Sequence, residues 1–306
     1  MSLDITRINP YFEDVMPQEY RDLVKNGSFG SEKRLGDLGT FKELLEEHPM
    51  CAGCHLALAF RILVSSLPRP EDSIMVGSTG CSSLAFTQLA LHNIHSLFGN
   101  QNAVASGLKR ALELRFPDKI KDVIVMAGDG ATADIGLDMT LHSWFRGENI
   151  TTVMFDNELY ANTGGQESGM TQCGAVLHMA PTGKKFQKIN VYDLAVSSGC
   201  AYAAVVSTAK PKNISECFKK AVLIAREVGP TYIQIFTPCP TNLKIKPSDS
   251  KKIATERFKG DYTFREHITD EAKEYLAISK DGIKKQAIEP ETVLISDDKE
   301  IPLEGS

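Results

Sequence analysis

The chain has 306 residues, of which 42% are hydrophobic and 24% charged, and its formal net charge is −5. This length and composition are those of a globular protein that can bury a full core. There is no basic footprint for nucleic acid, and no stretch approaches the roughly 18 uninterrupted apolar residues that a membrane helix needs. We therefore expect neither a nucleic-acid-binding protein nor a membrane protein.

The first 47 residues are polar and are interrupted by several glycines and prolines. We interpret residues 1–47 as an N-terminal arm with one helix near 40–48. From 48 to 245, short apolar runs alternate with amphipathic windows, which predicts an α/β fold with a parallel sheet flanked by helices. The predicted strands are 74–76, 123–126, 152–155, 203–206 and 232–236, and the predicted helices include 101–115, 134–146 and 213–228.

The composition changes after Lys244, where lysine, glutamate and aspartate become frequent as far as residue 288. We assign residues 246–306 to a charged C-terminal extension. Two interpretations of it are open, because a charged tail can either contact partner subunits or remain a solvated chain end.

Two of the predicted strands end in polar residues that suit a diphosphate site. The first ends at Gly128, Asp129 and Gly130, where glycine allows backbone N–H groups to approach phosphate oxygens. The second ends at Asp156 and Asn157. Adjacent parallel strands bring their carboxyl ends to the edge where open α/β sheets bind ligands. This layout is that of a thiamine diphosphate (TPP) site.

Asp129 and Asn157 can then share one Mg²⁺. This ion prefers hard oxygen ligands and keeps phosphate oxygens in its shell, so a carboxylate, an amide oxygen and the Leu159 carbonyl would complete a diphosphate-bridging site. The alternative is a simple turn at Gly-Asp-Gly and a helix cap at Asp-Asn, since such short motifs are common. The preceding strands and the spacing between the motifs favour the TPP site.

Four of the seven cysteines lie beside glycine or proline in loop-like sequence: Cys51 and Cys54 in CAGCH, Cys81 in GSTGCSS, and Cys239 in TPCPTN. Such segments can wrap closely around a metal cluster. Four thiolates fit either a [4Fe–4S] cluster or a structural zinc, but a zinc ribbon normally has two CxxC pairs and this chain has one. The dispersed spacing favours the cluster and leaves zinc open.

The other cysteines are Cys173, Cys200 and Cys217. Cys200 and Cys217 lie in apolar or helical surroundings, where free buried thiols are expected. A disulfide framework is not expected, because the number of cysteines is odd and no secretory signal is recognisable. We therefore expect a reducing, cytoplasmic location.

Together, the motifs GDGATADIG, DNELYANTGGQ, CAGC, GSTGCSS and PCPTN closely resemble those of the β subunit of the 2-oxoacid:ferredoxin oxidoreductases. The likeness runs from about residue 48 to about 245 and includes 95–111, which looks like the family helix after the cluster loop. It implies a TPP-binding fold with TPP, Mg²⁺ and a [4Fe–4S] cluster as cofactors. It also implies α-, γ- and δ-type partner subunits, and ferredoxin or another electron acceptor.

The resemblance assigns roles to individual residues. The Mg²⁺ positions correspond to Asp129, Asn157 and the carbonyl of Leu159, and the cluster positions correspond to Cys51, Cys54, Cys81 and Cys239. Asn162 corresponds to the asparagine that faces the substrate and the thiazolium. Three glycines fall in segments that approach the cofactor: Gly128, Gly130 and Gly164.

One group that TPP needs has no candidate in the recognised region, namely the glutamate that activates the aminopyrimidine ring. In the resembling family this glutamate sits on a partner chain, together with basic residues that hold the substrate carboxylate. We therefore expect the site to lie at a subunit interface and the chain to be inactive alone.

The chain also departs from the family pattern. After the Gly-Gly-Gln of the TPP loop, pyruvate enzymes usually show Ser/Thr-Pro, whereas this chain has SGMTQCGAVLHM. This segment brings Cys173 and His178, which would either line the substrate pocket or support the loop. Pyruvate is the default substrate, and phenylglyoxylate, another aromatic 2-oxoacid or oxalate remain open.

The expected reaction is oxidative decarboxylation of a 2-oxoacid with coenzyme A, giving an acyl-CoA and CO₂. Electrons would pass one at a time to the cluster and then to ferredoxin. Two other classes are open. A non-oxidative TPP decarboxylase or carboligase would have no use for four loop cysteines, and an iron–sulfur electron-transfer module would leave the Gly-Asp-Gly and Asp-Asn motifs unexplained.

Overall fold

The computed structural model describes residues 48–89 and 91–278. The predicted N-terminal arm, its helix near 40–48 and the last part of the C-terminal extension lie outside these residues. No helix in the described part of the chain is long and apolar enough to cross a lipid bilayer.

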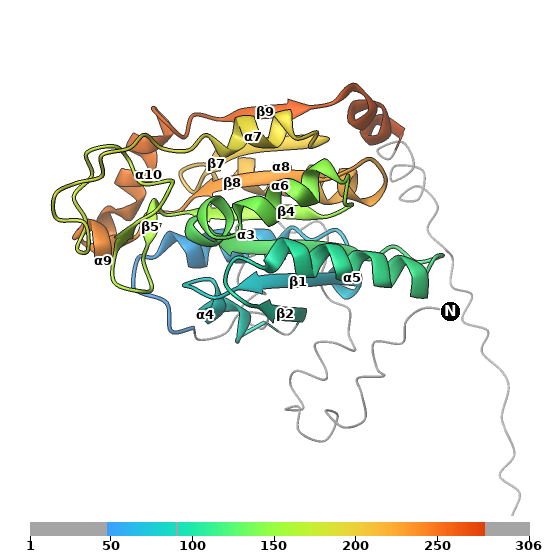
Figure 1. The fold of residues 1–306 in the computed structure, drawn as a ribbon, viewed down its shortest axis with the longest axis horizontal. Helices are drawn as coiled ribbons and strands as arrows, with labels where there is room; N and C mark the ends of the chain where they lie inside the picture. The colour runs from blue at the N-terminus through green and yellow to red at the C-terminus, as the bar shows by residue number, and fades with distance from the viewer. Residues whose placement is uncertain (1–47, 90, 279–306) are drawn as a thin grey trace, which may run out of the picture.

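Seven strands form one sheet in the order β2-β1-β3-β4-β8-β7-β9 (Figure 1). All neighbouring pairs are parallel except β7 and β9. The strands are β1 (Ser73–Ser78), β2 (His92–Ser96), β3 (Asp122–Gly128), β4 (Thr151–Asp156), β7 (Tyr202–Ser207), β8 (Thr231–Phe236) and β9 (Arg265–Ile268). A separate antiparallel pair is formed by β5 (Leu159–Tyr160) and β6 (Gln166–Glu167).

Helices cover both faces of the sheet, so the fold has three layers (Figure 1). The α-helices are α3 (His55–Ser65), α4 (Ser83–Phe86), α5 (Gln101–Arg115), α6 (Leu137–Phe145), α7 (Val191–Ser197), α8 (Pro211–Glu227), α9 (Pro240–Leu243) and α10 (Ser250–Phe258). The short helical turns are η2 (Pro70–Asp72), the π-helical η3 (Gly130–Asp134) and η4 (Pro247–Asp249), and residues 270–278 are also helical.

The strand side chains alternate between two cores. On β3, Ile124 and Met126 belong to the core that includes α3 and α8, whereas Val123 and Val125 belong to the core beside α5. Every residue of β4, β7 and β8 is buried, as expected for central strands of a parallel sheet covered on both faces. The predicted α/β architecture is confirmed.

The five predicted strands are all present, and each is longer than predicted by one or two residues at an end. The predicted helix 101–115 coincides with α5, and 213–228 corresponds to α8. The helix expected at 95–111 is partly wrong, because residues 92–96 form β2. This edge strand is exposed at four of its five residues, so it lacks the apolar pattern that would have marked it as a strand.

The described part of the C-terminal extension packs against the domain. β9 pairs with β7, and Glu266 on β9 accepts hydrogen bonds from the Tyr202 hydroxyl at 2.7 Å and the Lys220 ammonium at 2.8 Å. The expected boundary at residue 245 therefore does not end the folded unit, because the sheet continues beyond it. Contact of the extension with partner subunits stays a prediction.

A buried ion pair joins helix α8 to the start of β3. Arg226 donates two hydrogen bonds to the carboxylate of Asp122, at 2.9 and 2.7 Å, and the Asp122 side chain is only 2% exposed. We expect Arg226→Met to lower the free energy of unfolding by about 3 kcal/mol, because it leaves a buried carboxylate without its cation. Urea titration of the purified protein measures this loss.

The matched control is Lys212→Met on the same helix. Lys212 pairs with Glu216 at 3.7 Å, and both side chains are exposed. We expect this change to cost less than about 0.5 kcal/mol. Equal losses for the two variants would contradict the importance of the buried pair.

Candidate active site

Four adjacent strands of the sheet each end in a loop that carries a predicted site residue. In sheet order they are β1, β3, β4 and β8, and they lead to Cys81, Asp129, Asn157 and Cys239 respectively. The central strands end at nearly the same level. Gly128 on β3 pairs with Phe155 on β4, and Asp156 on β4 pairs with Phe236 on β8. The parallel topology therefore gathers the four loops at one edge.

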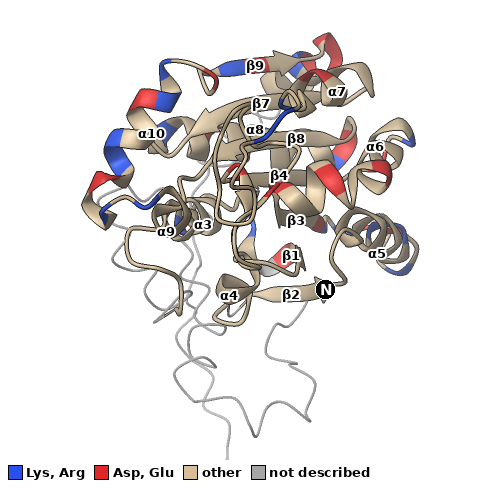
Figure 2. Cartoon of the chain, turned by 60° about the vertical axis from the view of Figure 1, so that its left-hand side comes forward, with Lys and Arg blue, Asp and Glu red and all other residues tan. Residues whose placement is uncertain are grey.

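A cavity of about 350 Å³ lies at this edge. It is lined by Leu56, Thr79, Gly80, Cys81, Ser82, Phe98, Gly128, Asp129, Gly130, Ala131, Ile135, Asn157, Leu159, Tyr160, Ala161, Asn162 and Thr163. No lysine, arginine or glutamate is among these residues, and Asp129 is the one lining carboxylate. In Figure 2, helices such as α5 and α10 are coloured at several charged residues, while α4, after the Cys81 loop, contains none.

Asp129 is a buried carboxylate with a neutral partner. It is 2% exposed and accepts a 2.6 Å hydrogen bond from the Ser168 hydroxyl. Burial, followed by the nearby Asp156 carboxylate, raises the pKa of Asp129 well above its ordinary value. No lysine or arginine of the described chain forms an ion pair with it. An unpaired buried carboxylate is costly, so this environment fits a bound cation such as Mg²⁺.

The loop after β4 presents two further oxygen atoms to the same cavity. The Asn157 side-chain oxygen accepts a hydrogen bond from the Leu159 backbone N–H at 3.2 Å, a local turn that fixes the amide. Between them, Glu158 has a positive φ of 67°, which is uncommon for a residue other than glycine. Asn157 and Leu159 both line the cavity, where an amide oxygen and a carbonyl suit Mg²⁺.

The structure thus brings most of the predicted cofactor residues together. Asn162 also lines the cavity and is itself exposed. Gly164 is not among the lining residues; it is exposed with φ 116°. The roles assigned to all these residues stay predictions.

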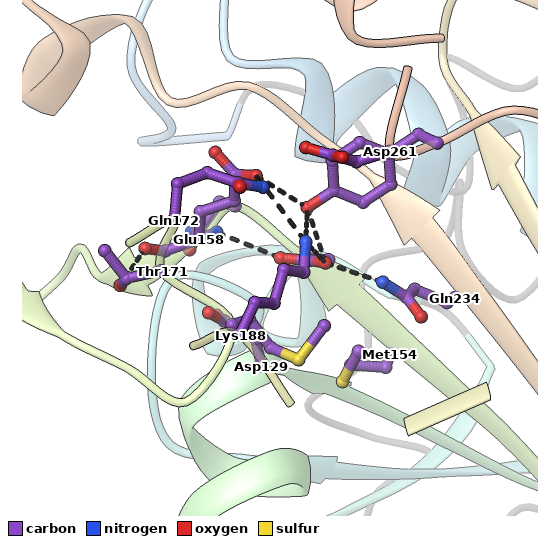
Figure 3. A network of polar contacts seen from close by, with 12 residues as sticks. Asp129, Met154, Glu158, Thr171, Gln172, Lys188, Gln234 and Asp261 are labelled. Carbon is purple, nitrogen blue, oxygen red and sulfur yellow. Dashed lines mark hydrogen bonds and ion pairs between the residues drawn. The ribbon is translucent and has the colours of Figure 1, made fainter. Parts of the chain in front are cut away.

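The carboxylates beside Asn157 are held by a network of polar contacts (Figure 3). Asp156 is fully buried and accepts hydrogen bonds from Gln234 at 2.7 Å, Tyr262 at 2.7 Å and Lys188 at 3.2 Å. Glu158 accepts hydrogen bonds from Gln172 at 2.7 Å, Tyr262 at 2.9 Å and Arg257 at 3.0 Å. Burial and the two carboxylates raise the pKa of Tyr262 well above its usual value, so its hydroxyl stays protonated.

The four predicted cluster cysteines are close enough to influence one another. Burial, and then the neighbouring thiols, raise the pKa of Cys81 to about 12; the neighbours are Cys239, Cys54 and Cys51. Burial also raises the pKa of Cys54, and Cys239 and Cys51 add to the shift. Cys81 lines the cofactor cavity together with Asp129. The thiols therefore lie beside this cavity.

Hydrogen-bond donors surround two of these thiols. Cys54 is the N-cap of α3, and the nearby backbone N–H groups of Leu56 and Ala57 lower its pKa, which favours the thiolate against the larger effect of burial. The Asn242 side-chain amide lies 3.5 Å from the Cys239 sulfur and donates to it. Such donors are typical of sulfur atoms that bind metal clusters.

Within the described residues, no group of three or more His, Cys, Asp or Glu side chains converges as ligands of a single metal ion would. A structural zinc needs four ligands around one point. In a [4Fe–4S] cluster the thiolates surround an inorganic core, because each one binds its own iron. A cluster or a zinc ion at these thiols stays a prediction.

Comparison with known proteins identifies the family of this chain. Residues 78–235 match the family described as thiamine pyrophosphate enzyme, C-terminal TPP binding domain. The chain is 35% identical to pyruvate synthase subunit PorB of Methanothermobacter marburgensis, over 67% of this chain and 73% of the relative. It is also 35% identical to ketoisovalerate oxidoreductase subunit VorB of Pyrococcus horikoshii, over 68% and 70%. The chain belongs to the TPP-binding β subunits of the 2-oxoacid:ferredoxin oxidoreductases.

A solved structure agrees with this assignment. The β subunit described here resembles a 2-oxoglutarate:ferredoxin oxidoreductase from Magnetococcus marinus, whose structure holds 2-oxoglutarate, coenzyme A and succinyl-CoA. The TM-score is 0.57 and the identity 28%, over 66% of this chain and 68% of the other. The expected TPP-binding fold is confirmed, and relatives of this β subunit work in multi-subunit enzymes.

Several supporting residues of the β subunit carry no sequence signal that points to the site. Ser168 donates to Asp129, and the Thr171 hydroxyl donates to the backbone carbonyl of Glu158. Both residues lie in the SGMTQ segment, which we had associated with the substrate. Lys188 and Tyr262 are farther along the chain, and only the fold brings them to the loop after β4.

Two residues of this segment are candidates for the substrate pocket, and the structure places both of them outside the lining of the cavity. Cys173 and His178 are exposed, and neither lines the cavity. The Cys173 sulfur lies 3.9 Å from the Lys185 carbonyl. Their position favours support of the loop over contact with a substrate in the cavity.

The turn between Cys51 and Cys54 depends on its glycine. Gly53 has φ 72°, and a Cβ atom there would lie 2.6 Å from the backbone of Pro247. We expect Gly53→Ala to displace the turn and to lower the iron bound per β subunit in the purified complex, measured by a colorimetric iron assay. The control is Gly107→Ala in α5, where an added Cβ meets no atom within 4 Å. Unchanged iron in Gly53→Ala would contradict this expectation.

Proposed function

We propose that this β subunit holds TPP, Mg²⁺ and a [4Fe–4S] cluster in a coenzyme A-dependent 2-oxoacid oxidoreductase. The complex would convert a 2-oxoacid to an acyl-CoA and CO₂ and pass single electrons through the cluster to ferredoxin. One observation carries the proposal: Cys81 and Asp129 line the same cavity. A cluster bound by the four thiols would therefore lie next to the cofactor that releases the electrons.

Each part of the cavity has a role in this proposal. Asp129, the Asn157 side-chain oxygen and the Leu159 carbonyl would hold Mg²⁺, and the Gly128–Gly130 backbone would accommodate the diphosphate. An alanine Cβ at Gly128 would meet no atom within 4 Å, so space is open beside this backbone. TPP, when bound, supplies the electron sink that decarboxylation of a 2-oxoacid requires. Asn162, which lines the cavity and is exposed, would contact the substrate.

The lining also indicates what partner subunits must supply. Its one carboxylate is the proposed Mg²⁺ ligand Asp129, so no described lining residue can act as the glutamate that activates the aminopyrimidine ring. No lining residue is a lysine or arginine that could bind the substrate carboxylate. Activity would therefore require α-, γ- and δ-type subunits, consistent with relatives that are named as subunits.

The substrate is proposed at the level of its class. The relatives are named for pyruvate and ketoisovalerate, and the solved structure for 2-oxoglutarate. We take pyruvate as the default, with phenylglyoxylate, another aromatic 2-oxoacid or oxalate as alternatives. The purified complex, assayed with a panel of these acids, coenzyme A and a viologen dye, tests the choice through the ratio of kcat/KM values.

Removal of the proposed Mg²⁺ ligand is the first test. We expect Asp129→Ala to abolish dye reduction and to lose bound TPP, because the diphosphate would lose its ion. The visible absorbance of the cluster should remain, because its proposed thiolate ligands are unchanged. TPP content, iron content and activity are measured on the same preparation. Retained activity would show that the cofactor lies elsewhere.

Removal of a proposed cluster ligand is the converse test. We expect Cys239→Ala to lower iron and acid-labile sulfide and to stop dye reduction, while TPP stays bound. Cys200→Ala is the control, because Cys200 is buried in a different apolar cluster. Full dye reduction by Cys239→Ala would show that this thiol does not hold the cluster that carries the electrons. A wild-type complex without iron and acid-labile sulfide would favour a simple TPP decarboxylase or carboligase. A wild-type complex without TPP would favour the electron-transfer module.

A further inference from the structure

We propose that Lys188, Arg257 and Tyr262, which we call the loop clamp, are positioning residues for the cofactor's Mg²⁺. The loop clamp holds the turn after β4 so that Asn157 and the Leu159 carbonyl face the metal, and it keeps the two flanking carboxylates away from it. This inference rests on the proposed function, because it concerns the same metal site.

The turn that the loop clamp holds is short and unusual. The turn consists of the consecutive residues 156–159. Along it, residues bound by the polar network alternate with residues that line the cavity. Asp156 and Glu158 are bound by the network, while Asn157 and Leu159 line the cavity. Glu158 has a positive φ of 67° within this turn. A left-handed glutamate persists only where surrounding contacts enforce it.

The two cations of the loop clamp neutralise the carboxylates of the turn, so these carboxylates do not need Mg²⁺ to balance their charge. Lys188 lies 3.2 Å from Asp156 and 3.5 Å from Glu158, and Arg257 lies 3.0 Å from Glu158. The two carboxylates of the turn are thus paired with two cations, and Arg257 also contacts the exposed carboxylate of Asp261 at 3.6 Å. Asp129 on the neighbouring strand has no cation among the described residues. The charges therefore direct a divalent ion to Asp129 rather than to the two carboxylates that flank Asn157.

Tyr262 connects the two carboxylates and anchors the loop clamp to the fold. Its hydroxyl lies 2.7 Å from Asp156 and 2.9 Å from Glu158, and Lys188 also donates to it. Its ring is fully buried and stacks on Phe236 of β8, with ring centroids 4.2 Å apart. Lys188 lies over the same ring, 4.1 Å from its centroid. Removing only the hydroxyl therefore leaves the packing in place.

The test measures how TPP binding to the purified complex depends on Mg²⁺. The complex is stripped with EDTA, Mg²⁺ is titrated at fixed TPP, and bound TPP is quantified after equilibrium dialysis. We expect Tyr262→Phe and Lys188→Met each to raise the half-saturating Mg²⁺ concentration about tenfold, as for residues that orient metal ligands. The iron content should not change.

Matched controls separate positioning from stability. Tyr202→Phe and Lys220→Met remove the same groups from a half-buried carboxylate elsewhere in the fold, Glu266 on β9. They should lower the unfolding temperature of the complex without changing the Mg²⁺ dependence. The proposal is refuted by one result in particular. In it, the wild-type complex shows Mg²⁺-dependent TPP binding, and both test variants have the same half-saturating Mg²⁺ concentration as the wild-type complex or the controls. If wild-type complex shows no such dependence, the proposed function itself is wrong, and the inference falls with it.

Discussion

The site depends on the parallel order of four neighbouring strands. β1, β3, β4 and β8 are adjacent, so their carboxyl ends are separated by only the spacing between hydrogen-bonded strands, about 5 Å per step. In sheet order, the loops after these ends carry a thiol, a carboxylate, an amide and a second thiol. Residues that are far apart in the chain, such as Cys81 and Cys239, are brought to one edge by this order, and the loops after β1 and β8 bring them within electrostatic influence of each other. The buried Val, Ile and Met side chains of the strands keep the edge in register.

Charge balance then distinguishes the carboxylates at this edge. Asp129, Asp156 and Glu158 are all buried, and carboxylates so close together repel one another unless cations or hydrogen bonds compensate them. Two of them are paired with Lys188 and Arg257. Asp129 has only the Ser168 hydroxyl and backbone support. The proposed metal site therefore depends both on Asp129, which has no cation, and on the two carboxylates that are already neutralised.

The sequence predicted the strands and the cavity residues better than their supports. Apolar runs identify β3 and β4, and glycine or polar residues at their ends identify Asp129 and Asn157, because both signals are local. β2 was missed because it is an exposed edge strand without apolar alternation. Ser168 and Tyr262 were missed because a serine in a loop and a tyrosine in a charged tail have no local signal. Their roles arise from contacts across 39 and 106 residues of chain.

The C-terminal segment links the two halves of the site. Pro247 packs against Gly53 in the turn between Cys51 and Cys54, and Tyr262, after the next helix, contacts the carboxylates of the turn after β4. The thiol side and the metal side of the cavity are thus supported by one stretch of chain. This stretch lies beyond residues 78–235, which match the TPP-binding family. A TPP-binding core that acquired cluster cysteines would need such a support, because a shift of either loop would change the distance between the cofactor and the thiols.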